Sequence, residues 1–179
     1  MDIKDIIKIA VVGPESTGKS SMANFLAKEL NTFCVPEYAR YYCKNLNNTY
    51  TLQDELNMFY GQLALEDALV SSINKNIIIC DTTILTVKIW SDYLFKQTPE
   101  NVTTEIISRQ YDYYLLLDID LPWENDPLRD FPNEREYFLE QWKLELNNIK
   151  ANYSMISGLG EQRFKNGLQH CKDFIKNHY

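Results

Sequence analysis

Histidine, arginine and paired cysteine are scarce in this sequence of 179 residues, and their scarcity excludes several kinds of site. The two histidines, His170 and His178, lie near the C-terminus, and the four cysteines form no Cys-x-x-Cys pair. Zinc sites need clustered cysteine and histidine ligands, and disulfide frameworks need regularly spaced cysteines. We therefore expect neither, and this cysteine usage favours a reducing, cytoplasmic location.

Long apolar runs and an excess of positive charge are also missing. No stretch approaches the roughly 20 apolar residues that a membrane-spanning helix needs. Residues 1–5 show no apolar signal core. Acidic residues outnumber basic ones by 25 to 18, giving a formal net charge of −7. We expect no membrane and no nucleic-acid partner, because a long basic surface is missing. The sequence leaves the oligomeric state open, including a homo-oligomer.

Short apolar runs alternate with longer amphipathic segments. Five runs are apolar enough to be strands buried on both faces of a parallel sheet, at Ile6–Val12, Phe33–Val35, Ile77–Cys80, Tyr113–Leu117 and Tyr153–Ser157. Helical patterns follow them at Ser20–Leu30, Leu52–Asn74, Ile84–Lys96, Arg135–Ile149 and Glu161–Asn177. This alternation predicts an α/β sandwich with a parallel sheet, in one domain over residues 1–179. Residues 118–135, which contain three prolines, are expected to form a lid within it.

Gly13–Ser20 matches the pattern G-x-x-x-x-G-K-[ST] in full, after a β-branched run and before a helical pattern. Gly13 and Gly18 allow the backbone to curl so that its N–H groups point at phosphate oxygens. Lys19 is expected to reach the β- and γ-phosphates of ATP, and the Ser20 hydroxyl to bind Mg²⁺. The nucleotide-binding residues predicted here are Gly13, Glu15, Ser16, Thr17, Gly18, Lys19, Ser20 and Ser21.

Two acidic residues follow strands at the edge where parallel sheets bind ligands. Glu37 follows the second apolar run, and Asp81 follows the third. Phosphoryl transfer to a hydroxyl needs a group that accepts its proton and a carboxylate near the metal. We expect Glu37 to be the base and Asp81 to bind the metal or the substrate hydroxyl. The alternative is that either carboxylate only caps the next helix.

Arg129 and Arg135 flank the proline-rich stretch. A closing arginine can stabilise the negative charge that develops on a transferred phosphoryl group, so Arg129 is predicted to be catalytic and to clamp the phosphates. The alternative is that both arginines are solvated at the surface. The aromatic rings of Trp90 and Tyr38 follow acidic strand ends and can stack on a flat or cationic substrate, or belong to the core.

Taken together, these segments resemble the ribosylnicotinamide kinase domain of the NadR family, within the AAA-type P-loop grouping. The resemblance covers roughly residues 6–175. It rests, in order, on Gly13–Ser20, Pro36-Glu37-Tyr38-Ala39-Arg40, Asp81-Thr82 with Trp90-Ser91, Tyr111–Leu116 running into Asp120–Trp123 and Asp126–Arg129, and Ile156-Ser157-Gly158 with Arg163.

The resemblance implies a thymidylate-kinase-like sheet of strand order 2-3-1-4-5 and ATP-dependent phosphorylation of nicotinamide riboside, or a similar riboside, to its mononucleotide. Arg163 would lie near the adenine of ATP. Residues of the riboside pocket would be Glu37, Tyr38, Arg40, Asp81 and Trp90. Since about five residues precede the first strand, the DNA-binding and nucleotidyltransferase domains of NadR proteins are not expected here. Where the family often has Asp-Asp-Gly in the lid, this sequence has Asn125-Asp126-Pro127.

Two other functions are consistent with the sequence. One is a kinase of a different nucleoside or nucleotide. A nucleotide acceptor needs further arginines to hold its phosphate, and Arg40 is the one arginine near the expected acceptor pocket. The other is a regulatory ATP-binding module that transfers no phosphate, although Lys19, Ser20 and the acidic strand ends favour transfer.

Overall fold

Strand β1 (Ile7–Val12) is the central strand of a five-stranded parallel sheet in the computed structural model, which describes residues 6–46, 51–126 and 128–178. It pairs with β3 (Ile77–Asp81) on one side and with β4 (Tyr113–Leu117) on the other. The short strand β2 (Cys34–Val35) and β5 (Tyr153–Ile156) form the two edges. The order β2-β3-β1-β4-β5 confirms the predicted α/β fold and strand order.

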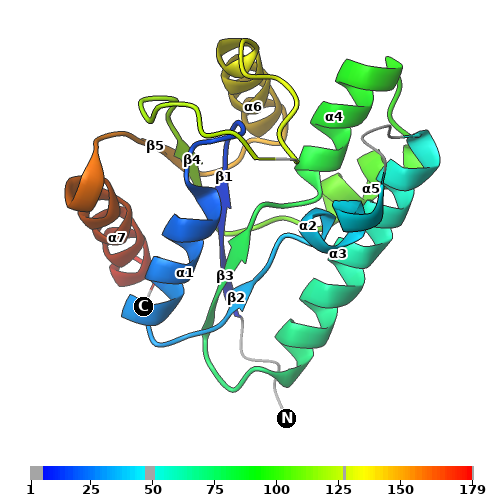
Figure 1. Cartoon of the computed structure of the whole chain (residues 1–179). Helices are drawn as coiled ribbons and strands as arrows, with labels where there is room; N and C mark the ends of the chain where they lie inside the picture. The colour runs from blue at the N-terminus through cyan, green and yellow to red at the C-terminus, as the bar shows by residue number, and fades with distance from the viewer. Residues whose placement is uncertain (1–5, 47–50, 127, 179) are drawn as a thin grey trace.

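Helices cover both faces of this sheet and make three layers (Figure 1). One face packs against α1 (Lys19–Glu29) and α7 (Gly160–Lys176), through side chains such as Ile9 and Leu115. Alternate strand residues, such as Ala10 and Leu116, face the opposite layer because side chains alternate along a strand. That layer contains α3 (Leu52–Ser72), α4 (Leu85–Phe95), α5 (Glu100–Ser108) and α6 (Arg135–Asn148). Among the described residues, no helix has the length and apolar character of a membrane span.

Three short helical elements were not predicted from the sequence. They are α2 (Ala39–Tyr42), the 3₁₀ helix η1 (Cys43–Asn45) and α5. The first two are too short to show a hydrophobic period, and α5 buries only Val102 and Ile106. The periodic signal on which the other helices were predicted is therefore absent from α2 and η1, whereas α5 is amphipathic and was missed.

The buried face of α3 differs from the predicted one. The sequence suggested a stripe that included Leu52, Leu56, Phe59, Leu63 and Leu69, but four of these leucines are only partly buried. The fully buried residues are Glu55, Met58, Phe59, Gln62 and Glu66. Three of the five are polar, so α3 presents both apolar and hydrogen-bonding groups to the interior.

The 118–135 segment connects β4 to α6 above the carboxyl ends of the strands (Figure 1). Its described residues before Arg135 form neither helix nor strand, and Pro127 lies outside the described residues. Arg135 begins α6 and donates hydrogen bonds to the carbonyl oxygens of Leu121 (2.8 Å) and Ser16 (3.2 Å). This side chain therefore ties the segment to the loop after β1.

Candidate active site

The loop between β1 and α1 curls tightly because three of its residues have positive φ. The angles are 140° at Gly13, 57° at Ser16 and 79° at Gly18. A Cβ atom at Gly13 would lie 2.9 Å from the carbonyl oxygen of Leu117, so both its φ and the space around it require glycine. Helix α1 begins directly after Gly18, with its N-terminal N–H groups facing the loop. Such a loop and helix N-terminus form a favourable site for phosphate.

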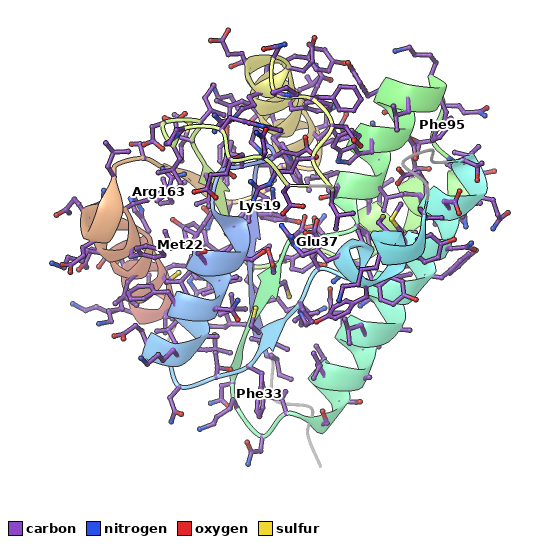
Figure 2. All side chains as sticks on the ribbon, viewed as in Figure 1. Lys19, Met22, Phe33, Glu37, Phe95 and Arg163 are labelled. Carbon is purple, nitrogen blue, oxygen red and sulfur yellow. The ribbon has the colours of Figure 1, made fainter. Side chains whose placement is uncertain are left out.

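Lys19 lies at the centre of a group of acidic side chains. Its Nζ atom donates a hydrogen bond to the Pro14 carbonyl oxygen at 2.8 Å. Burial lowers the pKa of Lys19, while the carboxylates of Glu37, Asp81 and Glu15 act in the opposite direction. Figure 2 shows Lys19 and Glu37 next to one another above the sheet. A buried ammonium group in this position can receive the phosphate of a nucleotide.

Asp81, the last residue of β3, shares a hydrogen bond with the Ser20 side chain. It is 3% exposed, and its Oδ1 atom has no hydrogen-bond partner in the described part of the chain. Burial, and secondly the nearby carboxylate of Glu37, raises the pKa of Asp81 to about 6. An unpartnered buried carboxylate oxygen beside a hydroxyl group suits a hard cation such as Mg²⁺.

Neither strand-end carboxylate caps a helix. Helix α2 and helix α4 both begin without a side-chain hydrogen bond at the cap position. Glu37 instead forms an ion pair with Arg40 at 3.2 Å, and Arg40 also reaches Asp126 of the 118–135 segment at 3.5 Å. Both Glu37 and Asp81 are thus available for a role other than capping.

The 118–135 segment contacts the phosphate-binding loop through several polar bonds. The Glu15 carboxylate accepts hydrogen bonds from the backbone N–H groups of Asp130 and Phe131, both at 3.3 Å. Arg129 donates hydrogen bonds to the Ser16 hydroxyl (3.2 Å) and to the Glu124 carbonyl oxygen (2.5 Å). Burial raises the pKa of Glu15 to about 7. These bonds place the Arg129 guanidinium group directly over the loop.

Arg163 fixes the far side of the loop. The residue is 3% exposed, and its guanidinium group forms an ion pair with Asp120. It also donates hydrogen bonds to the carbonyl oxygens of Thr17 (3.1 Å), Asp118 (2.8 Å) and Gly158 (3.3 Å). The side chain therefore holds backbone acceptors from three segments together, at the start of α7.

Two cavities meet above the sheet. The first, of about 130 Å³, is called the strand-end cavity here, and it lies among the β2–α2 corner, α3, α4, α6 and the phosphate-binding loop. The second, of about 290 Å³, is called the phosphate-loop cavity, and it lies among Ser16–Met22, the 118–135 segment and the start of α7. The residues that line both are Ser16, Lys19, Arg40 and Arg129. A group bound in one cavity would therefore face a group bound in the other across these side chains.

The predicted site residues fall on these cavities with two exceptions. Most of the predicted nucleotide-binding residues line the phosphate-loop cavity, namely Ser16, Thr17, Gly18, Lys19, Ser20, Ser21, Arg129 and Arg163. The other two, Gly13 and Glu15, line the strand-end cavity. The predicted substrate residues Glu37, Arg40 and Trp90 line the strand-end cavity as well. Tyr38 is outside the lining, since its ring packs against Gly61 of α3. Asp81 is outside the lining of both cavities and is joined to Ser20, which lines the phosphate-loop cavity.

Trp90 belongs to an aromatic cluster and also reaches the strand-end cavity, while contact with a substrate stays a prediction. Its ring lines the strand-end cavity and also packs against the rings of Phe138 (centroids 4.9 Å apart) and Phe131 (5.3 Å). The ring is thus held in position by an aromatic cluster while part of it faces the cavity.

Glu55 and Gln62 line the strand-end cavity and were not predicted. Gln62 accepts a hydrogen bond from the backbone N–H of Tyr38 (2.8 Å) and donates one to the Pro36 carbonyl oxygen (3.3 Å), so it holds the chain on both sides of Glu37. The signal in the sequence is the spacing of Glu55, Gln62 and Glu66, which places three polar groups on one face of a long helix.

A model of the AAA domain family matches residues 8–163. The trifunctional NAD biosynthesis/regulator protein NadR of Salmonella typhimurium is 28% identical over 176 residues, which cover 94% of this chain and 42% of that protein. The chain thus spans less than half the length of the curated relative that it matches. The similarity to NadR expected from the sequence is confirmed over nearly the whole chain.

Solved structures show the same fold. NadR bound to NR superimposes with a TM-score of 0.81 at 20% identity over 97% of this chain and 50% of that one. NadR bound to NAD and AMP-PNP gives 0.77 at 20% identity over 95% and 50%. Thymidylate kinase from Ehrlichia chaffeensis gives 0.65 at 15% identity over 94% and 98%. The expected likeness to thymidylate kinases is confirmed at the level of the fold.

Proposed function

Because the chain belongs to the AAA domain family of P-loop proteins, we propose that it transfers the γ-phosphate of ATP to nicotinamide riboside and forms nicotinamide mononucleotide, a step of NAD salvage. The observation that carries this proposal is the meeting of the two cavities at Lys19 and Arg129. The similarity to NadR, whose solved structures hold AMP-PNP in one case and NR in another, supports the choice of both substrates.

ATP would occupy the phosphate-loop cavity. Its phosphates would accept hydrogen bonds from the N–H groups of the Gly13–Ser20 loop and from Lys19. Its adenine would lie towards the start of α7, near Arg163 and Phe164. Mg²⁺ would be held by Ser20 and, directly or through water, by Asp81, and it would supply positive charge to the phosphate oxygens. No group of three or more His, Cys, Asp or Glu side chains suited to a metal occurs among residues 6–46, 51–126 and 128–178, so phosphate and water oxygens would complete the ligand set.

The riboside would occupy the strand-end cavity with a hydroxyl group beside Glu37. In the transfer, this hydroxyl oxygen forms a bond to the γ-phosphorus atom, the bond from phosphorus to the bridging oxygen breaks, and ADP leaves. The Glu37 carboxylate accepts the hydroxyl proton. Lys19 and Arg129 stabilise the charge that spreads over the phosphoryl oxygens, and the 118–135 segment excludes water as a lid.

The charges around the strand-end cavity favour an acceptor without a phosphate group. Its described lining contains three basic side chains, Lys19, Arg40 and Arg129, and all three also line the phosphate-loop cavity. The walls supplied by α3, α4 and α6 therefore offer no basic group of their own to a second phosphate. A nucleoside fits this distribution better than a nucleotide does.

The test is a panel of acceptors with ATP and Mg²⁺, with ADP release and product mass as readouts. Nicotinamide riboside, thymidine, deoxyadenosine and thymidine monophosphate are compared. We expect turnover with nicotinamide riboside, and turnover with another acceptor but none with this riboside would disprove the proposal. Glu37→Gln should keep ATP affinity and lose roughly 10²- to 10⁴-fold in transfer rate. The exposed Glu29→Gln is the matched control. A regulatory module would show no ADP release in any of these assays.

A further inference from the structure

Glu55 is a buried carboxyl group in the wall of the strand-end cavity, contributed by the first turn of α3. It is only 4% exposed. Every other acidic residue that lines this cavity has an ion pair, a hydrogen bond or another polar interaction. Within the described part of the chain, the Glu55 carboxyl group has neither a hydrogen bond nor an ion pair. Neither of its oxygens is among the fully buried side-chain atoms that lack a partner, so the carboxyl group opens onto the cavity, where a bound group of opposite charge would compensate it.

The described residues around Glu55 do not supply that group. The neighbouring charge that acts on it is Asp54, which is also negative. Burial, with a smaller contribution from Asp54, raises the pKa of Glu55 to about 8. The basic residues of the cavity gather instead where the two cavities meet, at Lys19 and Arg129.

Apart from Gln62, the remaining lining from α3 and α6 is apolar or aromatic. Met58 is on the next turn of α3, and Phe138 and Trp142 of α6 line the same cavity. A flat ring can lie against such side chains, and a positive charge on the ring is attracted both by aromatic faces and by a carboxylate. The lining therefore has the shape and the charge expected for a cationic aromatic ring.

We propose that Glu55 is a specificity-determining residue that selects nucleosides with a positively charged base over neutral ones. This inference rests on the proposed function, since it assigns the base of the acceptor to the part of the cavity beside α3. The ribose hydroxyl then lies towards Glu37, and the two acidic residues hold opposite ends of the acceptor.

The experiment compares nicotinamide riboside, which is a cation, with its reduced dihydro form, which has nearly the same shape and no charge. Binding of each to the whole chain is measured by calorimetry without ATP, and turnover is measured separately. Glu55→Gln keeps the size and hydrogen-bonding capacity of the side chain and removes its charge. We expect this variant to bind the cation roughly 10- to 100-fold more weakly and the neutral form about equally well. Glu145→Gln is the matched control, because Glu145 is buried and paired with Lys88 outside the cavity lining.

These measurements distinguish a failure of the Glu55 inference, a failure of the kinase assignment and a failure of both. One outcome is that the wild-type chain binds the cation but transfers no phosphate, while Glu55→Gln no longer binds the cation. In that case Glu55 selects charge and the kinase assignment is wrong. If turnover of nicotinamide riboside is normal and Glu55→Gln keeps the preference for the cation, the Glu55 inference is overturned alone. The same holds if Glu55 only donates a hydrogen bond, since glutamine can replace that. Failure of the wild-type chain to bind the cation overturns both.

A second readout is the pH dependence of binding. The cation should bind the wild-type chain more tightly as pH rises from 6.5 to 9, because the ionised form of Glu55 is the one that attracts it, and Glu55→Gln should lose this increase. The titratable or charged groups that face the cavity from the other elements are Glu15, Lys19, Glu37, Arg40, Cys43, Arg129 and Asp130, with Asp54 next to Glu55 on α3, and they are the same in both proteins. Among the described residues, α4 and α6 contribute no titratable side chain to the lining. An unchanged pH profile in the variant would contradict the inference.

Discussion

Arg163 donates a hydrogen bond to the Thr17 carbonyl oxygen at 3.1 Å, although 146 residues separate them in the sequence. The bond joins the start of α7 to the phosphate-binding loop, and the same guanidinium group also pairs with Asp120 beyond β4. The loop is therefore shaped by its own glycines on one side and by a distant arginine on the other. The shape of the phosphate site depends on a helix that follows the last strand.

Replacement of Arg163 by alanine should destabilise the protein and weaken nucleotide binding together. The change removes the ion-pair partner of Asp120, which keeps a hydrogen bond from the Gly158 N–H group, and it removes the donor to the carbonyl oxygens of Thr17, Asp118 and Gly158. The cost is about 3–5 kcal/mol in the free energy of unfolding. Arg163→Lys should restore little of the lost stability, because an ammonium group cannot match the planar arrangement of these acceptors. Urea denaturation and ATP binding measure both effects. Lys165→Ala, at an exposed position of α7, is the control, and equal stability of the two alanine variants would contradict this assignment.

Arg129 and Arg135 should differ sharply in transfer rate when each is replaced by alanine. Arg129 lines both cavities, so Arg129→Ala should lower the transfer rate roughly 10²- to 10³-fold. Loss of its hydrogen bonds to Ser16 and Glu124 should lower the free energy of unfolding about as much as Arg135→Ala does. Arg135 donates to the carbonyl oxygens of Leu121 and Ser16, so Arg135→Ala should lower the free energy of unfolding by about 1–3 kcal/mol. Steady-state kinetics and thermal unfolding of both variants check this. The opposite pattern would mean that Arg135, not Arg129, acts on the phosphates.

The sequence predicted the sheet because strands buried on both faces leave a plain signal. Tyr113–Leu117 is a continuous apolar run, Ile7–Val12 is apolar except for Lys8, and Gly13 marks where the latter ends. Glu37 and Asp81 could be found for the same reason, since each follows such a run. Tyr38 shows the limit of this reasoning, because whether its ring points to the cavity or to Gly61 depends on how α2 packs on α3.

Glu55 could not be found by the same route. A glutamate in the first turn of a helix is ordinary, and Asp54 beside it does form the capping box with Thr51. Only the placement of α3 against the β2–α2 corner and α4 shows which of the two acidic residues is buried in the cavity. The spacing of Glu55, Gln62 and Glu66 indicates a polar face on the helix, but a single sequence does not show which part of the protein that face meets.

Replacement of Lys19 by alanine should abolish most transfer. The side chain lines both cavities, and a phosphate that develops charge there loses its nearest ammonium group. We expect a fall in turnover of roughly 10²-fold or more. Lys28→Ala, at an exposed position near the end of the same helix, should behave as the wild type does. Turnover at the wild-type rate in Lys19→Ala, measured by ADP release, would contradict the placement of ATP in the phosphate-loop cavity.

The difference in stability between Glu55→Gln and the wild-type chain should grow with pH. Burial raises the pKa of Glu55 from 4.5 to about 8. Between these pH values the unfolded chain has released a proton that the folded chain retains, so the wild-type free energy of unfolding falls as pH rises through this window. Glutamine has no such proton. Glu15 and Asp81, whose pKa values are also raised, act in the same direction in both proteins and cancel in the comparison.

Urea denaturation of both proteins at pH 5, 6.5 and 8.5 measures this difference. Each pKa unit corresponds to about 1.4 kcal/mol. The free energy of unfolding of the variant should therefore rise relative to that of the wild type by at most on the order of 4 kcal/mol across the range. The exposed Glu29→Gln should show a constant difference, because its environment changes little on unfolding. A constant difference for Glu55→Gln as well would show that the Glu55 carboxyl group is already compensated in the free protein, and its proposed role in binding a cation would then lose its physical basis.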